Sequence, residues 1–176
     1  MKNILQLKHW QLFLLFYLVS GIPQFFLFGR IMNSERPQNL IALVAVPGIL
    51  VYLFWIYSMG IFLFRIRREG LNITRFKISF FFLTAYFFFF LVLFAFIKMD
   101  NLFASAWSVG FVVLHLIAIY CYLYCAFFSA KLLSSIEQNK SVGILGDIFF
   151  ILFFPLGVWI IQPRLNKIVR FQNSVT

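Results

Sequence analysis

Four long apolar segments, none of which contains Asp, Glu, Lys or Arg, set the strongest limit on the fold. They cover residues 10–29, 40–64, 78–97 and 102–130. About 20 apolar residues in an α-helix cross the hydrocarbon core of a bilayer, which is about 30 Å thick. With 63% hydrophobic and 11% charged residues, the chain is too apolar for a water-soluble core. We therefore expect an all-α fold, an integral membrane helical bundle that forms a single membrane domain over residues 1–176.

A fifth apolar segment, residues 142–162, is interrupted by Asp147 and Pro155. Its full length could just span a bilayer as a fifth helix, whereas its uncharged core has the length typical of a re-entrant segment. Pro155 removes a backbone donor and Gly157 permits a sharp turn, so a Pro/Gly-broken hairpin could pivot there. Asp147 has a suitable place to be the N-cap of the first half-helix.

The distribution of Lys and Arg distinguishes these two alternatives. Cytoplasmic loops of membrane proteins carry an excess of Lys and Arg. If residues 142–162 span the membrane, the 15 basic residues divide nine against six between the two sides. If the segment returns to the side it came from, they divide twelve against three. The count favours the re-entrant alternative in a multi-pass protein with both termini in the cytoplasm.

Basic residues are concentrated in the loop between the second and third apolar segments. They are Arg65, Arg67, Arg68, Arg75 and Lys77. A net charge of +10 would suggest nucleic acid as a partner for a soluble protein. These basic residues lie next to spanning helices, so the anionic lipid headgroups of the bilayer are the simpler partner. We therefore do not expect nucleic acid as a partner. A phosphate-bearing cytosolic signal or a partner protein is the alternative.

The fourth apolar segment carries small and polar residues along one face. Ser108, His115 and Tyr122 fall at intervals of seven, with alanines between and beyond them. Such a stripe predicts either close packing against another helix or the lining of a pore. His115 lies near the middle of the segment, where an ionisable side chain indicates a functional site. The alternative is a neutral imidazole that is hydrogen-bonded to a neighbouring helix.

Polar residues in the other segments could meet this stripe near the bundle axis, where Pro23 and Pro47 would open space by kinking their helices. The candidate pore or polar seam contains Gln24, Tyr52, Ser108, His115, Tyr122 and Asp147, with Tyr86 beside them. Such a seam can serve as packing contacts, a water-filled cavity or an ion path. Asp147 would lie at its mouth.

The sequence contains no motif that predicts catalysis. It lacks HExxH, GxSxG and Walker patterns, and no cluster has the ligand spacing of a zinc site. Cys121 and Cys125 lie one turn apart on a single helix, which predicts buried thiols and not a disulfide. We expect no cofactor, no metal site and no enzymatic activity.

The closing stretch GDIFFILFFPLGVWIIQPRLNKI, residues 146–168, resembles the end of small bacterial polytopic membrane proteins that have no assigned activity. In those proteins an acidic residue, a Phe-Phe-Pro-x-Gly-x-Trp core and a Gln-Pro-Arg-x-Asn tail recur. The resemblance implies bacterial origin, and hence the bacterial inner membrane, and it implies no activity.

Two functions fit these observations. The first is a homo-oligomeric, channel-like or membrane-perturbing protein that is lined partly by the fourth segment. By analogy with membrane effectors of bacterial defence systems, it would respond to a cytosolic signal at its basic loop. The alternative is an accessory or assembly subunit of a larger membrane complex, which would dock through the small-residue stripe.

Overall fold

The computed structural model describes residues 2–33, 37–67, 70–96, 108–137 and 143–175. All regular secondary structure within these ranges is α-helical, which confirms the predicted all-α fold. The helices are α1 (Lys2–Gln6), α2 (His9–Met32), α3 (Pro37–Ile66), α4 (Ile73–Phe96), α6 (Ser108–Ile136), α7 (Ile144–Leu152) and α8 (Phe154–Val175).

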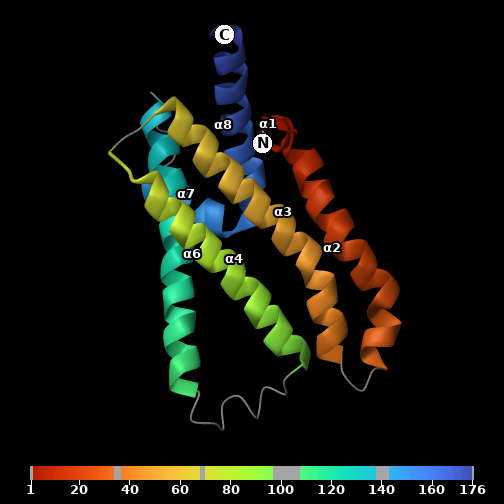
Figure 1. Ribbon diagram of the computed structural model, residues 1–176. Helices are drawn as coiled ribbons and strands as arrows, with labels where there is room; N and C mark the ends of the chain where they lie inside the picture. Colours follow the sequence, from red (N-terminus) through yellow and green to blue (C-terminus); the bar gives the residue numbers. More distant parts are fainter. Residues whose placement is uncertain (1, 34–36, 68–69, 97–107, 138–142, 176) are drawn as a thin grey trace.

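Four of the helices, α2, α3, α4 and α6, are long and apolar enough to cross a membrane, and they run up and down the bundle in turn (Figure 1). Several of their ends pass beyond the charge-free segments because a single Lys or Arg does not stop a helix. Helix α6, for example, continues through Lys131 to Ile136. The predicted start of the fourth segment at residue 102 lies outside the described residues.

The C-terminal segment forms a helical hairpin in place of one continuous helix. Helix α7 enters the bundle from one end, and α8 turns back and leaves at the same end (Figure 1). The N-terminus lies near that end as well. This arrangement has the shape expected for the re-entrant alternative, with both termini towards one end of the bundle.

The turn of the hairpin lies at Phe153, earlier than the predicted pivot at Pro155 and Gly157. Phe153 leaves the helical conformation with φ −93° and ψ 70°, and its carbonyl accepts the backbone N–H of Gly157 at 2.8 Å. Pro155 lies in the first turn of α8, where a missing backbone N–H breaks no helical hydrogen bond. Gly157 serves close packing and not the turn, because an added Cβ would lie 1.7 Å from the carbonyl oxygen of Phe150.

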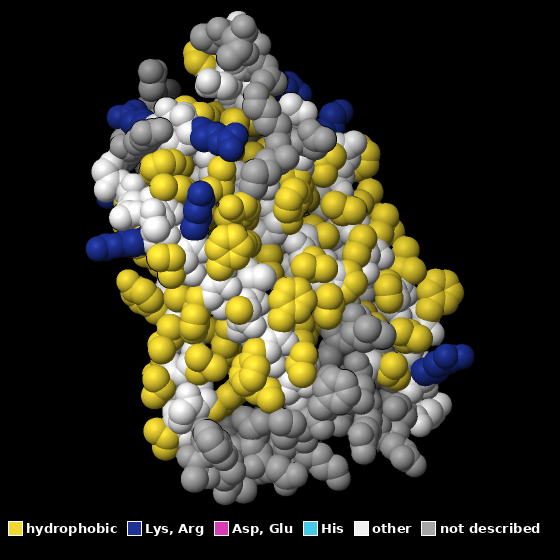
Figure 2. All heavy atoms as spheres, in the orientation of Figure 1, with side chains coloured by type: hydrophobic (Ala, Val, Ile, Leu, Met, Phe, Trp, Pro, Cys, Tyr) yellow, Lys and Arg dark blue, Asp and Glu magenta, His cyan; other side chains and the backbone are white. Residues whose placement is uncertain are grey.

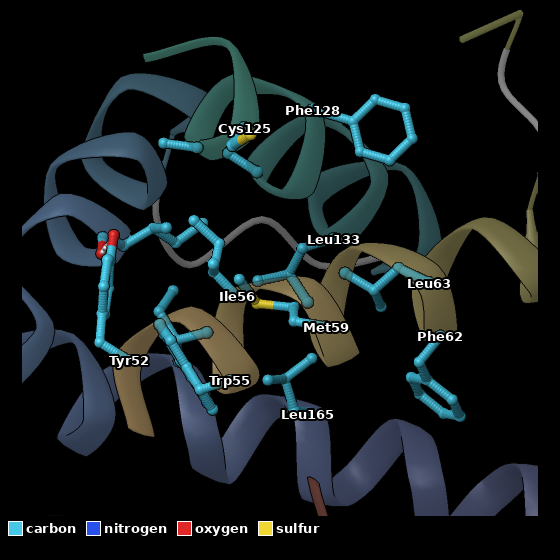
Figure 3. Packing of buried hydrophobic residues seen from close by; sticks show 14 of the residues in the cluster. Tyr52, Trp55, Ile56, Met59, Phe62, Leu63, Cys125, Phe128, Leu133 and Leu165 are labelled. Atoms are coloured by element: carbon cyan, nitrogen blue, oxygen red, sulfur yellow. Dashed lines mark hydrogen bonds between the residues drawn. The ribbon is translucent and has the colours of Figure 1, made fainter. Parts of the chain in front are cut away.

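The buried core lies between α3, α6 and the hairpin (Figure 3). One face of α3 is buried along its length through Gly48, Tyr52, Trp55 and Met59. Trp55 packs edge-on against Phe154 of α8, with ring centroids 5.1 Å apart. The core therefore depends on the hairpin as much as on the spanning helices.

Several described residues of the small-residue stripe on α6 pack inside one protomer. Ala118, Ala126 and Ser129 are buried, whereas Ile117 and Tyr120 on the opposite face are exposed. These members of the stripe therefore pack inside the protomer, whereas His115 of the same stripe is exposed, and the predicted pore lining and docking face stay predictions. Figure 2 shows apolar side chains over the middle of the molecule and most of the visible basic side chains towards the end where α8 projects.

Candidate functional site

The tip of the hairpin ends among hydroxyl groups supplied by two spanning helices. The last carbonyls of α7 have no partner in their own helix because the chain turns at Phe153. Tyr122 of α6 donates to the carbonyl of Leu152 at 2.9 Å. Tyr52 of α3 lies 3.3 Å from the carbonyl of Ile151 and 3.1 Å from the hydroxyl of Tyr122. These two tyrosines satisfy backbone groups that lipid could not hydrogen-bond.

A buried ion cluster joins the two halves of the hairpin and the end of α6. Arg164 of α8 donates to Asp147 of α7 at 3.0 Å and to Glu137 at 2.8 Å, with a further short contact to each acid. Burial alone would lower the pKa of Arg164, but the hydrogen bonds and charges of the two acids together raise it. The guanidinium therefore stays charged and neutralises carboxylates that would be costly to bury alone.

Asp147 does not have the predicted role of an N-cap. The N-cap of α7 is Gly143, which has no side chain to accept a hydrogen bond. Asp147 lies in the first turn of α7 and is fully buried against Arg164. Its carboxylate is already paired with Arg164, and its predicted place at a pore mouth stays a prediction. The hairpin explains the pairing, because it brings Asp147 and Arg164 to the same end of the bundle.

Two amides on α8 hold the N-terminal helix. Gln162 is fully buried, accepts the indole N–H of Trp55 at 2.8 Å and donates to the carbonyls of Leu5 and Leu7 at 3.1 and 3.0 Å. Asn166, one turn further along α8, also donates to Leu7 at 3.1 Å. Together they satisfy carbonyls at the end of α1, which would otherwise have no partner.

A cavity of about 490 Å³ lies at the tip of the hairpin. Its lining comes from α2, α3, α4, α6 and the turn of the hairpin, and it includes the candidates Gln24, Tyr52 and Tyr122. Gln24 and Phe153 remain exposed, so the cavity opens to the outside of the bundle. The rest of its wall is mostly apolar and aromatic. The structure thus brings three of the six seam candidates to one cavity.

The other seam candidates lie elsewhere. His115 is hydrogen-bonded to Tyr86 of α4 and is itself exposed, away from the cavity. The start of the predicted segment lies outside the described residues, so the place of His115 near its middle stays a prediction. The side chain of Ser108 lies outside the described residues, so its predicted role stays a prediction.

The basic loop divides into residues with different surroundings. Arg67 donates to the carbonyl of Ser135 at 2.7 Å, near the end of α6. Arg65, Arg75 and Lys77 are exposed, and Arg68 lies outside the described residues. The loop ends at Asn72, whose side-chain oxygen accepts the backbone N–H of Thr74 at 2.9 Å and caps α4.

Sequence reasoning missed the roles of Gln162, Asn166 and Glu137. Gln162 and Asn166 did stand out in the Gln-Pro-Arg-x-Asn tail, and their spacing of four places both amides on one face of a helix. Their partners in the first seven residues could not be read from that spacing. Glu137 gave no signal, because an acid just after an apolar segment is usually exposed to water.

No metal site emerges from the described part of the chain, where no three His, Cys, Asp or Glu side chains are grouped to hold an ion. Cys121 and Cys125 are buried free thiols, as predicted. No protein-family model, curated protein or solved structure matches the chain.

Proposed function

We propose that this is a non-enzymatic multi-pass protein of the bacterial inner membrane that binds an acyl chain of a membrane lipid in the cavity at the hairpin tip. The observation that carries the proposal is the cavity itself. Its volume of about 490 Å³ is in the range of small-molecule sites, roughly 300–1,000 Å³. An acyl chain suits it because the wall is mostly apolar and the cavity opens to the surroundings of the spanning helices.

The polar groups in the wall support a lipid chain over a water-filled path. Ser20 donates to the carbonyl of Phe16 in its own helix at 2.5 Å, and Tyr122 donates to the hairpin. These hydroxyl protons are therefore used within the protein. Gln24 has no hydrogen-bond partner in the described part of the chain and could bind an ester or hydroxyl group of the lipid.

Photolabelling in liposomes tests this proposal. A phospholipid that carries a diazirine on its acyl chain should label peptides around Gln24 and Tyr52 more strongly than other lipid-facing peptides. Gly21 lines the cavity and has no atom within 4 Å of an added Cβ, so Gly21→Phe should fill the space and reduce this labelling several-fold. Gly29→Phe is the matched control on the same helix, outside the cavity. Even labelling of all lipid-facing peptides, unchanged in Gly21→Phe, would contradict the proposal.

A second candidate function, self-association into a channel-like or membrane-perturbing assembly, is favoured by His115. This ionisable side chain is exposed on a candidate spanning helix, where direct contact with lipid is unfavourable. A second copy of the chain would cover it. A uniform oligomer in detergent, and ion flux in liposomes that falls in His115→Ala, would support this function. Absence of flux from the wild type would refute the channel, and stable association only with another chain would indicate an accessory subunit.

A further inference from the structure

A second, smaller crevice lies between α4 and α6 towards the basic end of the bundle. Its volume is about 240 Å³, and it is lined by Arg75, Ile78, Ser79, Tyr120 and Tyr124. Arg75 lies in the first turn of α4, at the level where Phe76 stacks on Phe128 of α6. Tyr124 and Tyr120 follow one and two turns deeper along α6. The crevice therefore has a cation at its outer end and aromatic rings on its inner wall.

The cation at the outer end has no acidic partner in the described part of the chain. The two described acids, Glu137 and Asp147, both bind Arg164. Arg75 is exposed and lines the same crevice as Tyr124. Lys131 lies on the same face of α6 as Tyr124, two turns nearer the basic end, with its ammonium group 5.8 Å from the ring centre of Phe127. Among the described residues, no carboxylate therefore neutralises the positive charge around the outer end.

The wall below the cation is apolar and faces outward. Ile78 is 64% exposed and Tyr120 is 66% exposed, so most of each side chain is uncovered within the described chain. Further along α6, Ile117 and Val113 continue the exposed apolar surface. A ligand that fits this shape has an anionic group and an apolar chain attached to it.

We propose that this crevice binds one anionic phospholipid, with its phosphate at Arg75 and an acyl chain along Tyr124, Tyr120 and Ile117. The site is separate from the cavity at the hairpin tip, which shares none of its lining residues. The lipid would bind at this one position, because binding needs both the guanidinium group of Arg75 and the crevice. General attraction of the basic end to the bilayer needs only charge.

Native mass spectrometry of the purified full-length protein in detergent tests the proposal. Phosphatidylglycerol and phosphatidylcholine with identical acyl chains are added at equal ratios, and the retained lipids are counted. The wild type should retain one phosphatidylglycerol with about a fivefold preference. Arg75→Gln should abolish the preference. Lys77→Gln removes the same charge from the same turn of α4 outside the crevice and should keep it.

Three results would overturn the proposal. Equal loss of preference in Arg75→Gln and Lys77→Gln would show attraction by overall charge. Equal retention of both lipids by the wild type would show that the crevice does not select an anion. Displacement of phosphatidylglycerol by water-soluble glycerol phosphate would show that the phosphate alone is recognised. Circular dichroism of both variants confirms that neither substitution at these exposed positions has changed the fold.

Discussion

Helix α2 and the α7–α8 hairpin are both apolar, yet they are held in the bundle in different ways. Within the most apolar part of α2 only 6% of the residues are buried. In the hairpin, Ile151, Phe154, Val158 and Ile161 are all buried, together with Asp147 and Gln162. A continuous helix satisfies its own backbone, so lipid can surround its side chains. A broken helix leaves backbone groups unpaired, so protein must surround it.

The hydrogen bonds, ion pairs and close helix contacts that distinguish these two regions lie in the hairpin. Its carbonyls meet Tyr52 and Tyr122, its two halves are joined by Arg164, and its helices approach closely at Gly157. Lipid-facing positions on α2 make no comparable contacts. Substitutions in the hairpin should therefore destabilise the protein, and substitutions on the outer face of α2 should not.

The largest effect is expected from Arg164→Met. It leaves Asp147 and Glu137 without their counter-charge, and Asp147 is fully buried. Loss of one partner from a buried ion pair costs about 3–5 kcal/mol. The free energy of unfolding can be measured by titration with sodium dodecyl sulfate in mixed micelles. Arg170→Met, at an exposed base of the same helix, is the control and should differ little from wild type.

A rescue experiment separates charge from packing at this site. Adding Asp147→Asn to Arg164→Met removes the uncompensated buried carboxylate, so the double variant should regain part of the lost stability. If the double variant is as unstable as the sum of the single variants, the cluster contributes through packing and not through charge.

Gly157→Ala is expected to have the next largest effect. The added Cβ would overlap the carbonyl oxygen of Phe150, which belongs to the backbone of α7 and cannot rotate away. Overpacking of this kind costs about 1–3 kcal/mol or more. Gly29→Ala on α2 meets nothing within 4 Å and is the control. Equal melting temperatures for both variants in detergent would mean that the hairpin packs differently from the structure.

Removal of the tyrosine hydroxyls should have a moderate effect. Tyr122→Phe and Tyr52→Phe each take a donor from a carbonyl at the hairpin tip and should cost about 0.5–1.5 kcal/mol. The double variant should lose less than the sum, because the two hydroxyls also contact each other at 3.1 Å. Tyr17→Phe, in the same cavity but with no hydrogen bond in the described chain, should leave the unfolding free energy unchanged.

Leu18→Ala should have the smallest effect. Leu18 on α2 is 50% exposed, and lipid or detergent surrounds the side chain before and after unfolding. The change in unfolding free energy should stay within about 0.5 kcal/mol. A loss well above 1 kcal/mol would show that this face of α2 packs against another chain, which would support self-association.

The contrast between α2 and the hairpin also explains what the sequence could predict. The four spanning helices were predictable because solvation by lipid depends only on local composition. The hairpin was predictable as an alternative from Pro155, Gly157 and the distribution of Lys and Arg. The position of the turn could not be predicted. Gly157 suggested a turn at its own position, but its role depends on close contact with Phe150 on the facing helix.

Long-range partners account for the remaining errors. Asp147 fits a local rule for helix N-caps, but a base 17 positions away takes its carboxylate. Gln162 looks like the end of an apolar segment, but its amide donates to carbonyls in the first seven residues and accepts from Trp55. The spacing of residues along one helix shows which of them share a face, but it does not show which other part of the chain that face contacts.

Cysteine labelling in intact cells tests the central claim that the C-terminal segment enters the membrane and returns. Cys121 and Cys125 are first replaced. A single cysteine is then placed either at Ser174, near the end of α8, or at Asn33, which follows α2 at the other end of the bundle. We expect a membrane-impermeant maleimide to label Asn33→Cys from outside and Ser174→Cys only after permeabilisation. Labelling of both positions from outside would show that the segment spans the membrane and would contradict the hairpin.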